Sequence, residues 1–355
     1  MFGVERRGAR GLSTDARIAV VRALHGLGDM LCAVPALSAL RRAHPRSHIT
    51  LIGLPACQWL LERFGALVDS LLPFPGFPGI PEQPYSPHAL AAFLARPERF
   101  DLAVQMHGSG TVSNAFTALL DARAVAGLYQ PGHYRPDAAM FFPYPDNGPE
   151  VHRWLFLTES LCCPSVDDRL TFPVSASDRA ALNAISELSA LPPGSFVCLH
   201  AGARDAARRW PAERFAAVAD HLAERGYSIV LTGTASERAA ADTVARAVRY
   251  PVINAAGQTS LGAVAALLER AALLVTNDTG ISHLAASLRT PSVVVFLASD
   301  PERWAPIDRS RHRCVIARRL PTGGLQPMRG SSDAVPAADD VLAEALALLS
   351  SGYDR

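Results

Sequence analysis

The stretch LLVTNDTGISHLAASL, residues 273–288, decides the fold. Leu273 to Thr276 is an apolar run typical of a buried strand, and Gly280 to Leu288 is predicted to be a helix. Between them, residues 277–280 form a short polar turn. A buried strand that leads through such a turn into a helix is typical of the units that build parallel sheets. The stretch therefore predicts an α/β fold, with the polar turn at the carboxyl end of a strand.

The second half of the chain continues this alternation of strand and helix. Strands are predicted at Phe196–His200, Ser228–Thr232, Val252–Ala255 and Val293–Leu297, and helices at Pro211–Arg225, Glu237–Arg249 and Leu261–Arg270. Strict alternation predicts a parallel sheet with helices on both faces. In such a sheet a ligand binds outside the carboxyl ends of the strands, so we look there for functional residues.

The first half begins with a βαβ unit. Arg17–Arg22 is predicted to be a buried strand, His25–Asp29 a tight turn, and Met30–Ala43 a helix that breaks or restarts at Pro35. A second strand at Ile49–Gly53 completes the unit. This half is therefore also predicted to be a parallel α/β domain.

Three further segments of the first half are informative. Asp101–Met106 is predicted to be a strand that ends at His107, and Glu150–Leu161 an amphipathic helix. Between the second strand and this one lies the proline-rich segment, residues 71–87, which is predicted to contain no regular element. Long loops of this kind in compact domains are often functional.

The 355 residues are enough for two domains. We place the boundary in the aperiodic segment 162–177, which contains Pro164 and Pro173. The predicted organisation is a loose tail at 1–16, a Rossmann-like domain at 17–165, a second Rossmann-like domain at 175–332, and a C-terminal helix and tail at 333–355.

Composition excludes several classes of function. The formal net charge is +1, without the basic excess typical of a nucleic-acid-binding protein. All 34 basic residues are Arg, so chemistry that needs a lysine is excluded. The six Cys show no C-x-x-C or zinc spacing, and there is no D-x-D pair, so no metal site is predicted. The N-terminus lacks the apolar core of a secretory signal, and we expect a reducing, cytoplasmic location.

Two strand ends of the first half hold candidate residues. Gly26-x-Gly28 is half of a dinucleotide-binding fingerprint, but Leu31 stands at the third glycine position, so the signal is weak. Asp29 is either a helix N-cap, the commoner role at such a position, or a general base. His107 lies at the end of a strand in the same half.

The polar turn at residues 277–280 is the sharper candidate in the second half. Thr279 and Gly280 open a helix, whose free N–H groups and partial positive charge suit a phosphate. Asp278 either binds a sugar hydroxyl or holds the loop, and His283, one turn into the helix, either faces the same site or packs in the core. Position alone does not separate these alternatives.

Two more strand ends of the second half carry candidate residues. After His200 come Gly202, Ala203 and Arg204, followed by Arg208, whose guanidinium can bind a phosphate or simply be solvated. Gly233 and Glu237 follow the next strand, and Glu237 either binds a ribose or favours a helix N-terminus.

These motifs, in this order, resemble those of glycosyltransferase family 9, the ADP-heptose:lipopolysaccharide heptosyltransferases. The resemblance extends over residues 17–306. It is carried by Gly28-Asp29 with Pro35-Ala36-Leu37, His200-Ala201-Gly202, Arg209-Trp210-Pro211, Leu231-Thr232-Gly233, Ala256-Gly257-Gln258-Thr259-Ser260-Leu261, Asp278-Thr279-Gly280 with His283 and Ala286, and Thr290-Pro291.

The resemblance implies a GT-B architecture, in which two Rossmann-like domains face a central cleft. It implies an acceptor in the first domain, near Gly28 and His107, with Asp29 as catalytic base and Arg208 as a basic residue beside the donor diphosphate. It also implies a nucleotide-sugar in the second domain. The implied donor-binding residues are Gly202, Ala203, Arg204, Arg208, Gly233, Glu237, Thr259, Asp278, Thr279, Gly280 and His283.

The implied reaction is inverting transfer of a sugar, heptose from ADP-heptose, to a hydroxyl of a lipopolysaccharide-core-type acceptor, without metal or other cofactor. Another nucleotide-sugar with a different glycan or small-molecule acceptor is an alternative, because the family's hydroxyl residues are missing at Gly202 and Ala203. An NAD-dependent oxidoreductase and a non-catalytic nucleotide-sugar-binding protein are further alternatives. The eight Arg of residues 1–60 allow contact with the inner membrane, although a solvated tail and helix end explain them slightly better.

Overall fold

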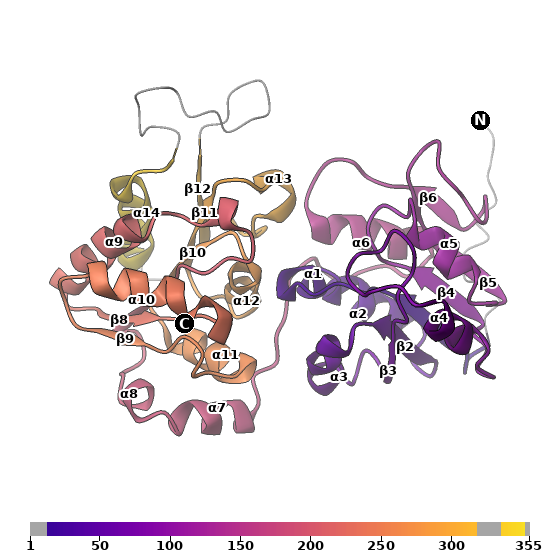
Figure 1. The fold of residues 1–355 in the computed structure, drawn as a ribbon, viewed down its shortest axis with the longest axis horizontal. Helices are drawn as coiled ribbons and strands as arrows, with labels where there is room; N and C mark the ends of the chain where they lie inside the picture. The colour runs from indigo at the N-terminus through magenta and orange to yellow at the C-terminus, as the bar shows by residue number, and fades with distance from the viewer. Residues whose placement is uncertain (1–12, 318–334, 352–355) are drawn as a thin grey trace. The chain divides into compact units, whose positions relative to one another are not determined.

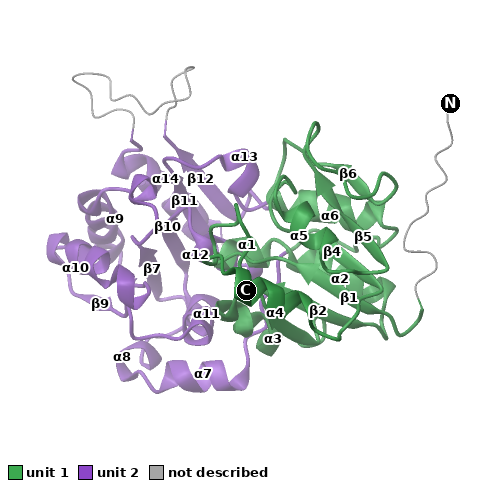
Figure 2. Cartoon of the chain, turned by 45° about the vertical axis from the view of Figure 1, so that its right-hand side comes forward, with its two compact units in different colours: residues 1–169 green, residues 170–355 purple. Residues whose placement is uncertain are grey.

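Each half of the chain is built on its own six-stranded parallel sheet. The computed structural model describes residues 13–317 and 335–351. The chain divides into unit 1, residues 1–169, and unit 2, residues 170–355 (Figures 1 and 2). Of the tail expected at residues 1–16, only residues 13–16 are described, and residues 318–334 of the predicted second domain and C-terminal segment also lie outside the described residues.

In unit 1 the sheet order is β3-β2-β1-β4-β5-β6. The strands are β1 (Arg17–Val21), β2 (His48–Gly53), β3 (Ser70–Pro73), β4 (Leu102–Gln105), β5 (Ala124–Tyr129) and β6 (Phe141–Pro143). The helices are α1 (Leu27–Leu31), α2 (Val34–Ala43), α3 (Gln58–Arg63), α4 (Pro87–Leu94), α5 (Ser113–Ala118) and α6 (Glu150–Ser160).

The helix predicted at Met30–Ala43 is two helices, α1 and α2, as the proline suggested. Pro35 lies in the first turn of α2, where its missing N–H is no loss because the first N–H groups of a helix have no partner inside it. The turn that separates β1 from α1 is short, so Asp29 is held close to the end of the strand.

The prediction that residues 71–87 hold no regular element is wrong at its start and at its last residue, Pro87, which begins α4. Ser70–Pro73 is β3, the edge strand that pairs in parallel with β2 from Thr50↔Ser70 to Gly53↔Pro73. An edge strand tolerates proline because one side of its backbone has no strand to bond. The strand was not predicted from the sequence because the segment is rich in proline.

In unit 2 the sheet order is β12-β11-β10-β7-β8-β9. The strands are β7 (Phe196–His200), β8 (Ser228–Leu231), β9 (Val252–Asn254), β10 (Leu273–Asn277), β11 (Ser292–Phe296) and β12 (His312–Ile316). The helices are α7 (Ala176–Asn183), α8 (Ser186–Ser189), α9 (Ala212–Glu224), α10 (Arg238–Ala247), α11 (Leu261–Arg270), α12 (Gly280–Ser287), α13 (Pro301–Trp304) and α14 (Ala338–Ser350).

Both sheets have the strand order 3-2-1-4-5-6 of the dinucleotide-binding fold when strands are counted within each unit. The order reverses between β1 and β4 in unit 1 and between β7 and β10 in unit 2. At such a switch point the two connections leave in opposite directions, and the ends of the strands are open to a ligand. These two places are where each unit can hold a substrate.

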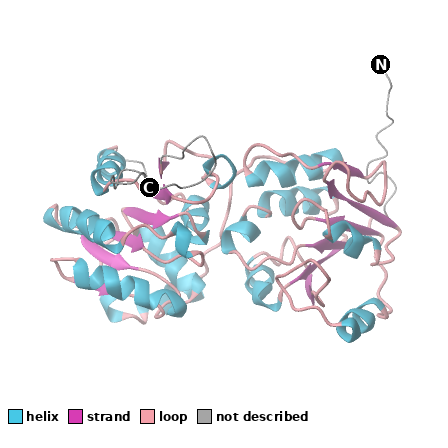
Figure 3. Cartoon of the chain, turned by 45° about the horizontal axis from the view of Figure 1, so that its top comes forward, coloured by secondary structure: helices cyan, strands magenta, loops and turns pink. Residues whose placement is uncertain are grey.

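The burial of the central strands explains why they could be predicted from the sequence. All residues of β7, β10 and β11 are buried, as expected where helices cover both faces of a parallel sheet (Figure 3). The core of unit 2 gathers side chains from these strands with Phe215 of α9 and Val341 of α14. None of the described helices is long and apolar enough to cross a bilayer.

Candidate functional site

The switch point of unit 2 is held together by one buried amide. Asn277, the last residue of β10, donates from Nδ2 to the carbonyl oxygen of Ala201 at 2.9 Å. Its Oδ1 accepts from the backbone N–H of Trp210, also at 2.9 Å. Asn277 therefore joins the turn after β10 to the loop after β7, which carries Arg208. The sequence motif contained Asn277 but did not indicate this role.

Arg208 and Asp278 meet at this switch point. Arg208 Nη1 lies 3.5 Å from Asp278 Oδ2, and the Asp278 side chain is 4% exposed against 38% for Arg208. Ser299 Oγ, from the loop after β11, also donates to Asp278 Oδ2. The buried carboxylate thus orients a guanidinium that remains open to solvent. Because a guanidinium has five N–H donors, Arg208 keeps donors for an anion.

The N-terminus of α12 lies directly beside this pair. Thr279 is the N-cap but makes no side-chain capping bond. Its Oγ1 is buried and has no hydrogen-bond partner among the described residues. A helix whose first N–H groups lack a cap, and whose N-terminal end carries partial positive charge, is suited to a phosphate. Gly280 begins the helix without a side chain over that end.

Glu237, Gly202 and His200 form a second group in unit 2. Glu237 Oε1 lies 3.6 Å from His200 Nε2, and Glu237 Oε2 accepts from the N–H and hydroxyl of Thr234 at 2.8 Å each. His200 first, then Thr234, lower the pKa of Glu237 to about 2 against the opposing effect of burial. A Cβ at Gly202 would lie 2.5 Å from Glu237 Cδ, so a side chain there would displace the Glu237 carboxylate. Glu237 is therefore ionised and caps a helix. Its close approach to Gly202 constrains the conformation of the loop after β7.

The remaining predicted donor residues are more dispersed. Ala203 is buried and its carbonyl oxygen accepts from Arg209 Nε at 2.9 Å, whereas Arg204 is exposed. A Cβ at Gly233 would lie 3.3 Å from both Ala256 Cβ and Glu237 Cβ. Thr259 is half-buried just before the N-terminus of α11. His283 is buried and packs edge-on against Trp304, with ring centroids 6.2 Å apart.

In unit 1, Asp29 lies inside α1 and not at its N-cap. The N-cap is Gly26, in an extended conformation, and Asp29 is in the first helical turn with the buried Gly28 before it. The N-cap alternative for Asp29 is therefore wrong. A Cβ at Gly26 would collide with the Asp29 carboxylate, which shows that this side chain folds back over the turn after β1. Any other residue at 26 would force the Asp29 side chain to move.

Arg22 is a residue of this site that the sequence did not reveal. It is completely buried, and its guanidinium donates to the carbonyl oxygen of Met106 at 2.6 Å and to that of Asp29. Its Cζ lies 4.6 Å from the centre of the Trp154 ring. Arg22 thus joins the turn after β4 to α1. The sequence did not predict a buried position for Arg22, because an arginine that directly follows an apolar strand is usually exposed.

His107 faces the same switch point in a fixed protonation state. Its Nδ1 accepts from the backbone N–H of Ala23 at 3.2 Å, so the proton of the neutral ring is on Nε2. Burial, helped by the positive charge of Arg22, lowers the pKa of His107 to about 4. At neutral pH, His107 is therefore an uncharged hydrogen-bond donor.

This low pKa predicts acid sensitivity of the fold. Between pH 6.5 and about 4 the unfolded chain binds a proton at His107 that the folded chain does not, so stability falls as pH falls through this window. We expect the free energy of unfolding, measured by urea titration at pH 7, 5.5 and 4.5, to fall less steeply in His107→Gln than in the wild type. Replacement of the exposed His88 by Gln should leave the slope unchanged, and equal slopes in all three proteins would contradict the prediction.

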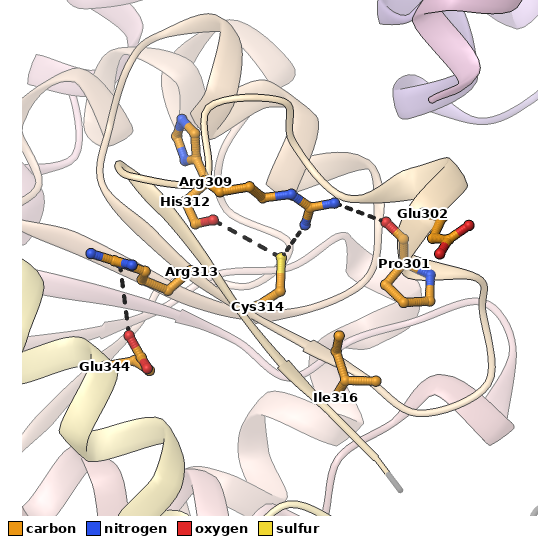
Figure 4. Close-up of a pocket in the computed structure, with 8 residues that line it drawn as sticks. All are labelled: Pro301, Glu302, Arg309, His312, Arg313, Cys314, Ile316 and Glu344. Carbon is orange, nitrogen blue, oxygen red and sulfur yellow. Dashed lines mark hydrogen bonds and ion pairs between the residues drawn. The ribbon is translucent and has the colours of Figure 1, made fainter. Parts of the chain in front are cut away.

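A cavity of about 310 Å³ lies elsewhere in unit 2, beside the edge strand β12 (Figure 4). Most of its charged groups are already engaged: Arg309 bonds Cys314 Sγ and the carbonyl oxygen of Pro301, and Arg313 pairs with Glu344 at 3.8 Å. None of the predicted site residues lines it. We therefore place no substrate in this cavity. Among the residues of known placement, no three His, Cys, Asp or Glu side chains are grouped so as to hold a metal ion.

The chain matches known proteins in sequence and in structure. The model of a family described as glycosyltransferase family 9 (heptosyltransferase) matches residues 94–322. Lipopolysaccharide heptosyltransferase 1 of Pseudomonas aeruginosa is 29% identical over 304 residues, which is 80% of each chain. With several other curated heptosyltransferases the match spans only about a third of their length.

Two solved structures show the same fold. A family 9 glycosyltransferase from Veillonella parvula has a TM-score of 0.76 at 22% identity, over 96% of this chain and 99% of the other. The Escherichia coli heptosyltransferase WaaC, solved with ADP, has a TM-score of 0.66 at 20% identity, over 94% and 99%. The predicted α/β class, with two Rossmann-like domains of the GT-B type, is thereby confirmed.

Proposed function

The chain belongs to glycosyltransferase family 9, and from that premise we propose that it transfers heptose from ADP-heptose to a hydroxyl of a lipopolysaccharide-core-type acceptor. One observation carries this proposal. At the switch point of unit 2, the solvent-open guanidinium of Arg208 is fixed by the buried Asp278 beside the uncapped N-terminus of α12. That arrangement offers two sources of positive charge to one diphosphate.

In the proposed reaction the donor diphosphate lies between Arg208 and the start of α12. As the bond between the anomeric carbon and the diphosphate oxygen breaks, the leaving ADP takes the electron pair and its negative charge grows. Fixed donors that meet this charge stabilise the transition state without having to reorganise. Arg208 and the α12 N–H groups would supply that stabilisation, so we propose that transfer is independent of metal.

Asp29 would act as the general base. Its carboxylate takes the proton of the acceptor hydroxyl while the hydroxyl oxygen attacks the anomeric carbon, opposite to the leaving diphosphate. A single displacement of this kind inverts the anomeric centre. The folded-back side chain over Gly26 supports the assignment, because it holds the carboxylate beside the turn after β1, at the switch point of unit 1.

We further propose that the protein works at the cytoplasmic face of the inner membrane. A nucleotide-sugar and a glycolipid acceptor would meet there, and peripheral contact through the basic first 60 residues would suit an acidic lipid surface. Within the same family the donor could instead be another nucleotide-sugar, an alternative supported by Gly202 and Ala203, which offer no hydroxyl beside the phosphates.

The first test is binding and turnover of the donor. ADP-heptose and ADP should stabilise the protein by about 2.7 kcal/mol at a hundredfold excess over their dissociation constants, and NADH should not. A coupled assay should then detect ADP release from ADP-heptose that depends on added lipopolysaccharide core and is unchanged by EDTA. Stabilisation by UDP or GDP alone would mean that the donor is a UDP- or GDP-sugar and not ADP-heptose. Stabilisation by NADH alone would overturn the proposal, and loss of turnover with EDTA would contradict metal independence.

A further inference from the structure

The proline-rich segment is fixed to unit 1 by aromatic packing. Phe74 and Phe77 pack edge-on against Phe116 of α5, with ring centroids 5.0 and 5.6 Å apart. Gly76, at a φ of 84°, lies so close to Pro84 that a side chain there would collide with its carbonyl oxygen. The segment therefore folds back on itself in a defined shape beside the helix that follows β4. Each proline further limits its freedom by fixing φ.

This packing brings Glu82 to the switch point of unit 1. The backbone carbonyl of Glu82 accepts a hydrogen bond from His25 Nε2 at 2.8 Å, and His25 lies in the turn after β1. The carboxylate Oε2 lies 3.8 Å from Nε2 of His107, which follows β4. Glu82 thus touches the turns after both strands between which the sheet order reverses.

The Glu82 carboxylate is not fully satisfied. Because His107 Nδ1 accepts from Ala23, the Nε2 proton is available to Glu82, but 3.8 Å is too long for a hydrogen bond. Oε2 is buried and makes no hydrogen bond within the part of the chain that the structure describes. The side chain as a whole is 22% exposed, so a ligand can approach it from solvent. A carboxylate in this state can accept hydrogen bonds from a ligand.

Glu82 also lies near the proposed base. Arg22 uses one guanidinium to bond the carbonyl oxygens of both Asp29 and Met106, so α1 and the turn that begins with His107 are neighbours. His107 in turn contacts Glu82. The two carboxylates are therefore placed around the same end of the sheet, and both belong to unit 1.

We propose that Glu82 is a specificity-determining residue that binds the acceptor, by accepting a hydrogen bond from a sugar hydroxyl next to the one that is deprotonated. His107 lies beside one oxygen of the carboxylate without a hydrogen bond to it, so the carboxylate can accept the hydroxyl. A carboxylate at this position favours a neutral, hydroxyl-bearing part of the acceptor and repels a phosphate or carboxylate there. The assignment rests on the proposed glycosyltransferase function, although the contacts that define it lie in unit 1 alone.

The test is calorimetric binding of two probes to the full chain. The first is de-acylated lipopolysaccharide core from a heptose-deficient strain, and the second is ADP. Glu82→Ala should weaken core binding by about tenfold to a hundredfold, the range for a lost hydrogen bond to a charged group, and leave ADP binding unchanged. Glu62→Ala, which removes an exposed carboxylate from α3 of the same unit, should change neither. In the transfer assay Glu82→Ala should raise KM for the core more than it lowers kcat.

A second variant distinguishes a loss of binding from a loss of folding. Glu82→Gln keeps the shape of the side chain and should show a smaller loss of core affinity at an unchanged melting temperature. Wild-type core affinity in Glu82→Ala, or a wild type that binds ADP but not the core, would overturn the proposal. Core binding that depends on Glu82 in a protein that ignores ADP would instead support Glu82 and refute the proposed donor.

Discussion

Asp29→Asn should lower the rate of heptose transfer by about 10²- to 10⁴-fold, the usual contribution of a general base. The amide keeps the size of the carboxylate, so it still fits over Gly26, but it cannot take the proton of the acceptor hydroxyl. ADP affinity should be unchanged, because Arg208 and α12, which would bind the diphosphate, are in unit 2. The measurement is ADP release at saturating donor and acceptor.

Two further variants accompany Asp29→Asn, one as a control and one as a second test. Asp15→Asn removes a carboxylate that is 73% exposed and pairs with Arg46 at the surface, so its transfer rate should equal that of the wild type. Gly26→Ala should impair transfer as well, since the new Cβ occupies the space of the Asp29 carboxylate. If Asp29→Asn retained more than about a tenth of the wild-type rate, another group would have to be the base.

Arg22→Met should lower the free energy of unfolding by about 3 kcal/mol or more. The substitution leaves the buried carbonyl oxygen of Met106 and the part-buried one of Asp29 without this donor, at a cost of about 1–3 kcal/mol for each. It also removes the contact between the guanidinium and the Trp154 ring. The measurement is chemical denaturation at pH 7 followed by tryptophan fluorescence, to which each unit contributes two tryptophans.

The matched control for Arg22 is Arg46→Met. Arg46 is 66% exposed and its pair with Asp15 spans 3.3 Å at the surface, so the loss should be below about 1 kcal/mol. An Arg22→Met variant as stable as the wild type would mean that removing a buried charge from the interior offsets the two lost hydrogen bonds. Such a variant should still lose transfer, because Arg22 positions α1 and therefore Asp29.

The candidate site was only partly predictable from sequence. The turn at residues 277–280 was found because an apolar strand and a helix flank it, and Arg208 because it follows a strand of the same sheet. The pairing of Arg208 with Asp278 was not visible, because 70 positions separate them in the chain. Glu82 was not predicted for a related reason. A glutamate between prolines is typical of an exposed loop, and only the packing of the segment on Phe116 brings Glu82 to the site.

The sequence by itself determined β1, β2 and β4 of unit 1 and β7 to β11 of unit 2, since fully buried strands are continuous apolar runs and short polar turns end them. It missed β3, β5, β6 and β12. It also determined the family, through motifs whose residues are local in the chain. Only the tertiary structure decided what those residues contact. The strand order brings the turns after β1 and β4, and those after β7 and β10, to common sheet edges. The roles of Arg22, Asn277 and Glu82 follow from that juxtaposition, because hydrogen bonds between distant segments leave no periodic signal in a sequence.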